Sequence, residues 1–204
     1  MNIFLTGASS GIGQTCYKLL VEQGYVVTTP TKDQLNLRHH SEIELLDLSV
    51  YDVVINCAGF NVGTYQGFYK NPTANQIEQI DVNFIGPLML AKNYSQSNPQ
   101  GHFVYISSGS IDNPYLYNLI NSTSKAALRF SMDILRKNLR DFTISEICPG
   151  KTKTNMLKQN YNGTKTDQDI EDEYDQNPHL TTDQVADAVL FAIRNRIDVI
   201  KLSP

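Results

Sequence analysis

The chain has 204 residues, a length that suits one domain with a full hydrophobic core. Its hydrophobic content of 41% and charged content of 19% are ordinary for a globular protein, and its net charge of −4 excludes strong electrostatic attraction to nucleic acid or to a membrane surface. No apolar run approaches the roughly 20 residues that cross a bilayer. The start, MNIFLTGASS, has no basic region before its apolar residues, so we expect no signal peptide and a cytoplasmic location.

The cysteines and histidines give no pattern typical of a metal or disulfide site. Cys16, Cys57 and Cys148 are far apart, and each lies in an apolar pattern, which predicts buried, reduced thiols. Two of the four histidines, His39 and His40, are adjacent, and adjacent side chains do not converge on one ion. We therefore expect no bound metal.

Short apolar runs alternate with helical patterns along the whole chain, which predicts an α/β fold. The runs with strand character are rich in β-branched residues: Ile3–Leu5, Tyr25–Thr29, Val53–Cys57, Phe103–Ile106, Thr143–Ile147 and Val199–Leu202. Apolar residues at helical spacing lie between them: Ile12, Cys16, Leu19 and Leu20; Ile77, Ile80, Phe84, Ile85 and Leu88; Val185, Val189, Ala192 and Ile193. Right-handed crossovers then give a doubly wound parallel sheet of the Rossmann type, a single domain over residues 1–204 with helices on both faces.

Two segments depart from this rhythm. Between Thr29 and Val53 there is barely room for a helix and a strand, so one crossover must be short or irregular. Residues 154–182 are polar, with weak periodicity, and a structureless connection this long is typical of a mobile substrate loop or of a disordered loop. Its acidic residues either attract a cationic substrate or simply lie in solvent.

A glycine-rich turn follows the first strand in the sequence FLTGASSGIGQ. Gly7, Gly11 and Gly13 would allow a tight turn, close approach of the backbone to a diphosphate and close packing of the next helix. The N-terminus of that helix offers unpaired N–H groups to phosphates. A plain strand–helix turn would explain one or two of these glycines, but three together favour a nucleotide site.

With Thr6 before it, this glycine spacing resembles that of the short-chain dehydrogenase/reductase family. Six further motifs follow in the family's order: LNL, NCAG, DVNFIG, VYISSGS, NSTSKAAL and CPGKTKT. The resemblance covers essentially the whole chain and implies an oxidoreductase that binds NADP or NAD. The cofactor-binding residues it implies are Gly7, Ser9, Ser10, Gly11, Ile12, Gly13, Thr31, Lys32, Asn36, Leu37, Asn56, Ala58, Gly59, Lys125, Pro149, Gly150, Thr152 and Thr154.

The end of the second strand indicates which dinucleotide would bind. An acidic residue there accepts hydrogen bonds from the ribose of NAD, whereas this chain has Thr31 followed by Lys32. A hydroxyl beside an ammonium favours the 2′-phosphate of NADP. A shift of two residues would instead bring Asp33 to the position and favour NAD, and Lys32 could equally be an ordinary surface lysine.

The resemblance also implies a catalytic set with one substitution. Ser108 takes the place of the serine that holds the substrate oxygen, Lys125 that of the lysine, and Asn83 that of the helix asparagine. The position of the tyrosine proton donor holds Asn121, both when counted forward from Ser108 and when counted back from Lys125. A carboxamide does not release a proton at any relevant pH, so Asn121 cannot act as that acid.

Three explanations of Asn121 stay open. A neighbouring tyrosine could donate the proton, either Tyr115 or Tyr117, of which Tyr117 would lie two turns before Lys125 if the helix starts early. Water or the substrate could supply it, with Asn121 only orienting the oxygen. Otherwise the protein is a catalytically impaired nucleotide binder, and both tyrosines pack a loop or a dimer surface. The substrate, a small-molecule carbonyl or alcohol, has no recognisable code.

The resemblance implies an assembly as well. Members of the family often pair through two long helices, which would begin here near Asn75 and Asn121, to form a homodimer or a homotetramer.

Overall fold

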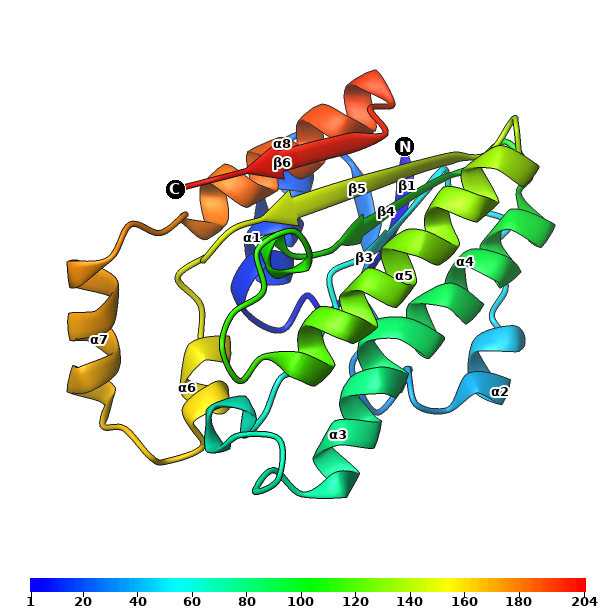
Figure 1. The fold of residues 1–204 in the computed structure, drawn as a ribbon. Coiled ribbons are helices and arrows are strands. Elements are labelled where there is room, and N and C mark those ends of the chain that lie inside the picture. The colour runs from blue at the N-terminus through cyan, green and yellow to red at the C-terminus, as the bar shows by residue number, and fades with distance from the viewer.

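The computed structural model describes all residues, Met1–Pro204. One parallel sheet of six strands forms its centre, in the order β2-β1-β3-β4-β5-β6 (Figure 1). The strands are β1 Asn2–Thr6, β2 Val26–Thr28, β3 Val53–Asn56, β4 His102–Ile106, β5 Thr143–Pro149 and β6 Val199–Leu202. The doubly wound sheet expected from the sequence is confirmed, and all six predicted strands are present. Because the strands are parallel, their carboxyl ends share one edge, and the loops and short helices gather there.

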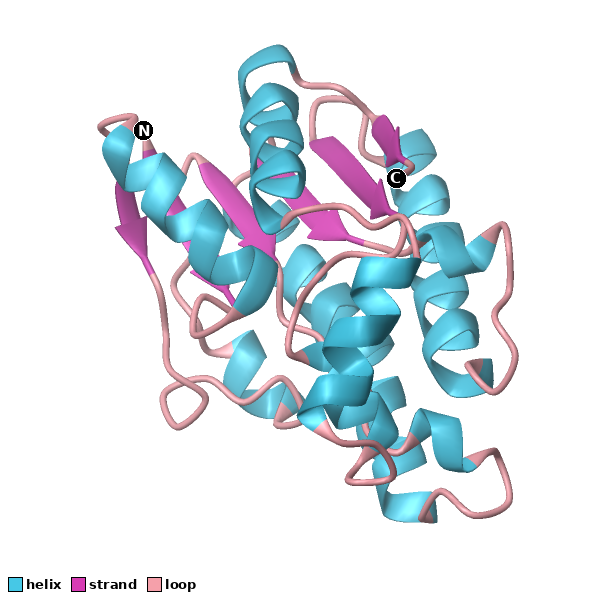
Figure 2. Cartoon of the chain, turned by 90° about the vertical axis from the view of Figure 1, so that its left-hand side faces the viewer, coloured by secondary structure: helices cyan, strands magenta, loops and turns pink.

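Helices cover both faces of the sheet (Figures 1 and 2). The α-helices are α1 Gly11–Glu22, α2 His40–Glu44, α3 Thr73–Ile80, α4 Gly86–Ser97, α5 Leu119–Asn138, α6 Met156–Tyr161, α7 Asp167–Gln176 and α8 Thr182–Asn195. Two short 3₁₀ helices, η1 Thr64–Gln66 and η3 Gly109–Ile111, and a π-helical segment, η2 Asp81–Ile85, complete the set. The segment η2 joins α3 to α4 without a break in the helical ribbon.

The two faces form two separate hydrophobic cores. Side chains alternate along a strand, so Ile3 and Leu5 of β1 pack on α1 and α8, whereas Phe4 packs on the side of α4 and α5. The helix α8 supplies a large share of the first core through its small and β-branched residues, and it begins with a capping box between Thr181 and Gln184. Since both faces are covered, every residue of β3 and β4 is buried, and all of them except Asn56 and His102 are hydrophobic.

The crossover between β2 and β3 is irregular, as predicted. It contains the five-residue helix α2 and no further strand. Leu35, Leu37, Ile43 and Leu48 of this segment are buried in the core on the α4 side. The chain therefore runs as a packed loop along one edge of the sheet.

The prediction of a structureless connection over residues 154–182 is wrong. The segment contains α6 and α7, which are joined by a small cluster of Leu157, Ile170 and Tyr174. The weak apolar periodicity of the segment did not predict these two helices. Three apolar side chains pack them together, and a capping box between Thr166 and Asp169 starts α7. Its mobility stays a prediction.

Cys16 and Cys148 are buried, as predicted, but Cys57 is only half-buried, and all three are unpaired. No helix combines the length and the apolar character needed to cross a membrane. Groups of three or more His, Cys, Asp or Glu side chains that could hold a metal ion do not occur.

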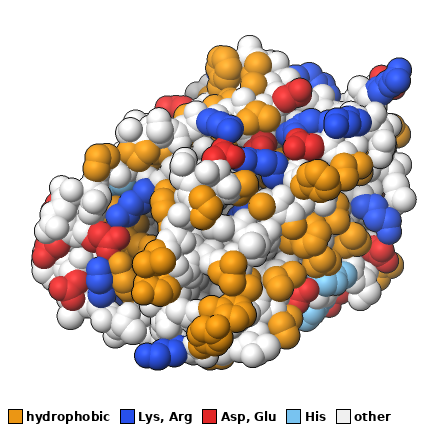
Figure 3. All heavy atoms as spheres, viewed as in Figure 1, with side chains coloured by type: hydrophobic (Ala, Val, Ile, Leu, Met, Phe, Trp, Pro, Cys, Tyr) orange, Lys and Arg blue, Asp and Glu red, His pale blue; other side chains and the backbone are white.

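The helices α3 and α5 begin at Thr73 and Leu119, within two residues of the predicted starts. Hydrophobic side chains gather on the face of the molecule seen in Figure 3. Phe130 and Ile134 of α5 are among the exposed large hydrophobic residues of the chain. Pairing through this face stays a prediction.

Candidate active site and cofactor cavity

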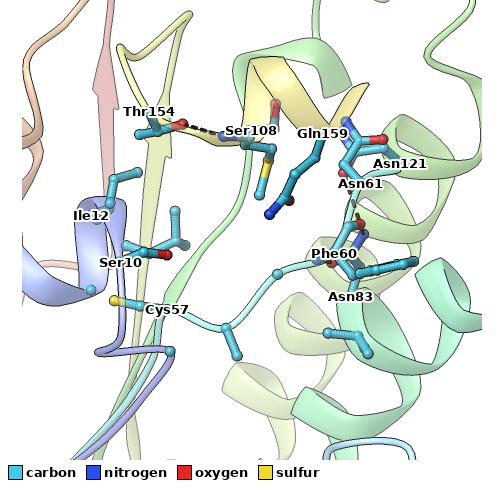
Figure 4. A pocket seen from close by; sticks show the side chains of 18 of the residues that line it. Ser10, Ile12, Cys57, Phe60, Asn61, Asn83, Ser108, Asn121, Thr154 and Gln159 are labelled. Atoms are coloured by element: carbon cyan, nitrogen blue, oxygen red, sulfur yellow. Dashed lines mark hydrogen bonds between the residues drawn. The ribbon is translucent and has the colours of Figure 1, made fainter. Parts of the chain in front are cut away.

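A cavity of about 800 Å³ lies at the carboxyl edge of the sheet. Its wall includes residues that follow β1, β2, β3, β4 and β5, so every loop at this edge contributes. Figure 4 shows Ser10 and Ile12 on one side of the cavity and Asn61, Asn83 and Asn121 on the other. We call these two sides the glycine end and the amide end.

All but one of the predicted cofactor-binding residues line this cavity: Gly7, Ser9, Ser10, Gly11, Ile12, Gly13, Thr31, Lys32, Asn36, Leu37, Ala58, Gly59, Lys125, Pro149, Gly150, Thr152 and Thr154. The exception is Asn56, which is completely buried and lies beneath the wall. Its Oδ1 accepts a hydrogen bond of 2.8 Å from Thr6 Oγ1. Asn56 therefore ties β3 to β1 under the glycine turn.

The glycine end is shaped by backbone that approaches backbone. Gly7 has a φ of 74°, and a Cβ on it would lie 2.5 Å from the backbone nitrogen of Ala58. A Cβ on Gly13 would lie 2.1 Å from the carbonyl oxygen of Gly7. Neither position can hold a side chain without moving the turn or the strand beside it.

The first turn of α1 faces the cavity with its backbone donors free. Ser10 precedes the helix in an extended conformation and makes no capping hydrogen bond with its side chain. The N–H groups of Gly11, Ile12 and Gly13 stand ahead of the first helical hydrogen bond, which runs from Gln14 N to Ser10 O. This end of α1 also carries the positive pole of the helix dipole, so it suits a bound phosphate.

Thr31 and Lys32 line the cavity where β2 ends, whereas Asp33 does not. An acidic residue that the sequence reasoning missed is also present, because Glu78 of α3 reaches the same place. Its carboxylate lies 3.7 Å from Lys32 Nζ and 3.3 Å from the guanidinium of Arg38. Because Lys32 and Arg38 both face the single carboxylate of Glu78, this part of the cavity wall has a net positive charge.

At the amide end, Asn83 fixes Asn121. Asn83 lies in η2, is completely buried, and forms two hydrogen bonds with the backbone of Phe60, one as acceptor at 2.9 Å and one as donor at 2.7 Å. The same Nδ2 group also donates to Asn121 Oδ1 at 3.3 Å. The oxygen of Asn121 is therefore engaged, and its Nδ2 group, which has no partner within the protein, is left to donate to a ligand.

Lys125 lies one helical turn after Asn121 on α5 and is 7% exposed. Its Nζ donates a hydrogen bond of 2.8 Å to the carbonyl oxygen of Ile106. Burial lowers the pKa of Lys125 to about 8, against the opposing effects of Cys57 and Glu146. The ammonium is thus the ionisable group of the wall closest in pKa to neutral pH among those with a resolved shift.

Ser108 caps the short helix η3 at the end of β4. Its Oγ accepts a hydrogen bond of 3.1 Å from Ser110 N and lies 2.9 Å from Ser110 Oγ. These contacts hold the hydroxyl on the cavity wall, between the glycine end and the amide end.

The prediction that Tyr117 could lie on an early turn of the helix is wrong. The helix α5 begins at Leu119, and Tyr117 precedes it in a left-handed conformation, with a φ of 66°. Tyr117 is 57% exposed, although it still lines the cavity together with Tyr115. A tyrosine held so loosely is not positioned against Lys125 by helical spacing.

Further carboxamides at the amide end were missed from the sequence: Asn61, Asn118, Asn155, Gln159 and Asn160. Asn61 accepts a hydrogen bond from Thr64 and donates one of 3.4 Å to Asn118 Oδ1, and Asn118 in turn donates to Ser122 Oγ at 3.3 Å. Asn61 and Asn118 come shortly after NCAG and just before NSTSKAAL, so their nearness to these motifs was the available signal.

The 154–182 segment closes the cavity over the amide end. Met156, Leu157 and Tyr174 line the wall, and Tyr65 of η1 stacks on Tyr161 with ring centroids 4.5 Å apart. Glu173 accepts hydrogen bonds from Lys151, Lys165 and Tyr161 at 2.9, 3.0 and 2.6 Å. Burial acts to raise the pKa of Glu173, but these hydrogen bonds lower it to about 2, so the carboxylate stays charged.

The profile of the family described as short chain dehydrogenase matches residues 41–165, more than half of the chain. Dehydrogenase/reductase SDR family member 7B of Xenopus laevis is 26% identical, over 95% of this chain and 71% of its own length. An uncharacterised oxidoreductase of Staphylococcus epidermidis is 27% identical, over 93% of this chain and 89% of its own.

Solved structures show the same fold. The closed form of a serine dehydrogenase complexed with NADP⁺ superposes with a TM-score of 0.86 at 20% identity, over 100% of this chain and 95% of the other.

Proposed function

Because the chain belongs to the short-chain dehydrogenase family, we propose that it is an NADP(H)-dependent oxidoreductase acting on a carbonyl or alcohol group of a small molecule. One observation carries this proposal. A single cavity joins the free N–H groups of α1 to Ser108, Lys125 and Asn121, so that a dinucleotide and a small substrate can lie side by side.

The glycine end fits a nicotinamide dinucleotide. Its diphosphate would bind at the first turn of α1, in the space that Gly7 and Gly13 leave free. The 2′-phosphate of NADP would bind near Thr31 and Lys32, where Arg38 adds a second cation. The NADP⁺ complex of the similarly folded serine dehydrogenase supports this choice, with NAD as the weaker candidate.

When bound, the nicotinamide supplies or accepts a hydride at the substrate carbon. The side chains of the amide end would hold the substrate: the Ser108 hydroxyl and the Nδ2 group of Asn121 donate hydrogen bonds to the carbonyl oxygen and stabilise the charge that develops on it. Lys125 would bind a ribose hydroxyl with one of the two N–H groups that Ile106 leaves free. Without a tyrosine acid we expect slow turnover, since losing one general acid typically costs roughly 10² to 10⁴ in rate.

A second candidate is a nucleotide binder without turnover. The hydrogen bond between Asn83 and Asn121 favours this second candidate. It fixes the Asn121 carboxamide within a hydrogen-bond network that contains no acid. The two candidates predict the same cofactor affinity and differ only in whether the bound cofactor reduces a carbonyl substrate.

Fluorescence titration with NADPH and NADH, followed by a screen of carbonyl compounds for NADPH oxidation, tests both. The proposed function expects NADPH to bind more tightly than NADH and at least one carbonyl to be reduced. Binding of NADPH without oxidation by any carbonyl would leave the binder. If neither dinucleotide binds, both candidates fail.

A further inference from the structure

Carbonyl reduction consumes a proton together with the hydride, and the wall of the cavity offers few groups that could give one. At the glycine end, Lys32 and Glu78 are ion-paired to each other, far along the wall from Ser108 and Asn121. Lys151 is bound to Glu173 at 2.9 Å. These charged groups are committed to partners.

The buried tyrosines and the thiol hold their protons too tightly. Burial raises the pKa of Tyr65 to about 12. The pKa of Tyr174 is raised for the same reason, and its hydroxyl contacts the backbone carbonyls of Thr152 and Thr154. A hydrogen bond with Cys16, followed by burial, raises the pKa of Cys57. None of these is a good acid near neutral pH.

Lys125 is different in both position and contacts. Its ammonium has three N–H groups and uses one of them, toward Ile106 O, so two remain for ligands. The nitrogen lies 3.9 Å from where a Cβ on Gly59 would be, on the inner wall next to Asn83. Because Asn121 is much shorter than a tyrosine, no aromatic ring separates the ammonium from the substrate side.

The groups around the ammonium also favour an acid that can release its proton. Burial pushes the proton off the nitrogen, while Cys57 of the β3 loop and Glu146 of β5 favour keeping it. Glu146 is itself neutralised by Arg129 at 2.7 Å, which limits that opposing effect. The resulting pKa of about 8 lies close to physiological pH, where a general acid works best.

We propose that Lys125 itself is the proton donor for carbonyl reduction in this chain. This inference rests on the proposed function, with a reduced nicotinamide dinucleotide as the hydride source. As the hydride forms the new C–H bond, an Nζ–H bond of Lys125 breaks and its proton forms the O–H bond of the alcohol, directly or through one bridging water. The neutral amine then regains a proton from water.

The pH dependence gives the first test. Protonated Lys125 is required, so kcat for carbonyl reduction should be level below about pH 8 and fall about tenfold per pH unit above it. Lys125→Ala should lower kcat at least about 100-fold. Added small primary amines should restore activity to this variant, with a rate that depends on the pKa of the amine. Lys153→Ala, which removes an exposed lysine outside the cavity, should keep the parent's rate and pH profile.

Two further measurements cover the case in which Lys125→Ala folds poorly. Lys125→Arg keeps a cation for the ribose but does not release its proton at any pH used, so it should bind NADPH and lose turnover. In protein with ¹³C-labelled lysine, the Cε resonance that is missing from Lys125→Arg should titrate near pH 8, well below the value of about 10.4 for lysine in a model peptide. This readout requires no activity.

The outcomes separate the inference from the proposed function. If the parent reduces a carbonyl but Lys125→Arg keeps the same rate and pH profile, Lys125 is not the acid. Amine rescue that is absent, or a Cε midpoint above pH 10, would also overturn the inference. If Tyr117→Phe alone removes turnover, the acid is Tyr117. A parent that binds NADPH and oxidises it with no carbonyl defeats the proposed function instead.

Discussion

The two ends of the cavity are built by different means. At the glycine end, backbone packs against backbone, and the features that matter are the absence of Cβ atoms at Gly7 and Gly13 and the free N–H groups of α1. At the amide end, side chains contact other side chains, as in the bond between Asn83 and Asn121. A backbone site tolerates changes in nearby side chains, whereas a side-chain site changes its chemistry with one substitution and keeps its shape. A chain can therefore keep its cofactor cavity and alter its reaction.

The largest expected effect comes from placing a side chain in the glycine end. In Gly13→Val the new Cβ would meet the carbonyl oxygen of Gly7, which forces the turn out of place. We expect NADPH affinity to fall at least about 100-fold, equivalent to about 2.7 kcal/mol, in a fluorescence titration. Circular dichroism would check that the variant is folded.

Gly24→Ala is the matched control for that experiment. Gly24, unlike Gly13, has a left-handed φ, of 80°, but a Cβ on it would meet nothing within 4 Å. It should lose some stability through backbone strain and keep the parent's affinity for NADPH. A similar loss of affinity in both variants would mean that the glycine end is not a backbone cradle for the diphosphate.

A smaller effect, in the opposite direction, is expected at the amide end. Asn121→Tyr introduces a phenol one turn before Lys125, where the ammonium can lower the pKa of that phenol. Reduction of simple carbonyls should rise at least about tenfold, a modest part of what a general acid supplies. The rate of NADPH oxidation measures it.

Asn121→Phe provides the control, since it adds the same ring without the hydroxyl and should not raise the rate. An equal gain in both variants would show that filling the space, rather than supplying an acid, changes turnover. No gain in Asn121→Tyr would show that the amide end cannot be converted by this one residue.

The choice between NADP and NAD should depend on a contact of moderate strength. The Lys32 side chain is 69% exposed and is shared with Glu78, so its contribution to binding is that of a surface charge. Lys32→Ala should weaken NADPH roughly 3- to 5-fold, about 1 kcal/mol, and leave NADH nearly unchanged. Lys70→Ala, which removes an exposed lysine away from the cavity, should change neither affinity. Equal affinity of the parent for both dinucleotides would contradict a site for the 2′-phosphate.

The smallest effect is one of local dynamics. A small cluster of Leu157, Ile170 and Tyr174 anchors α6 and α7, whereas the glycine end is continuous with the core strands. We expect faster amide hydrogen exchange in α6 and α7 than in β1 and β3 of the free protein, and slower exchange there once cofactor and substrate bind. Protection in α6 and α7 equal to that of the strands would contradict a mobile segment.

The sheet and the glycine turn could be predicted from the sequence because their signals are local. The alternation in β1 and the spacing of Gly7, Gly11 and Gly13 are set within a dozen residues. Positions that depend on distant partners could not be predicted. Glu78 forms an ion pair with Lys32 although the two residues are 46 positions apart in the chain, and no spacing rule predicts such a contact.

Of two other differences, one has a local signal in the sequence and the other has none. The sequence TKTDQD contains Thr166 and Asp169, which form a capping box. This signal of a helix start does not depend on apolar periodicity. The left-handed Tyr117 had no such signal, because its φ is fixed by how the loop before α5 returns to the helix. The roles of the side chains at the amide end therefore cannot be predicted without the tertiary contacts.

The carboxylate of Glu173 determines how the closed cavity responds to ionic strength. It connects α7 to Lys151 after β5 and to Lys165 and Tyr161 within the 154–182 segment. Attraction between opposite charges therefore holds this segment over the amide end of the cavity. Dissolved salt screens mainly the attraction between charges that are farther apart than the Debye length, which is about 8 Å at physiological concentration and about 3 Å at 1 M. The contacts of Glu173 are 3.0 Å or shorter, and its side chain is only 20% exposed, so we expect added salt to leave product release, where it limits turnover, nearly unchanged.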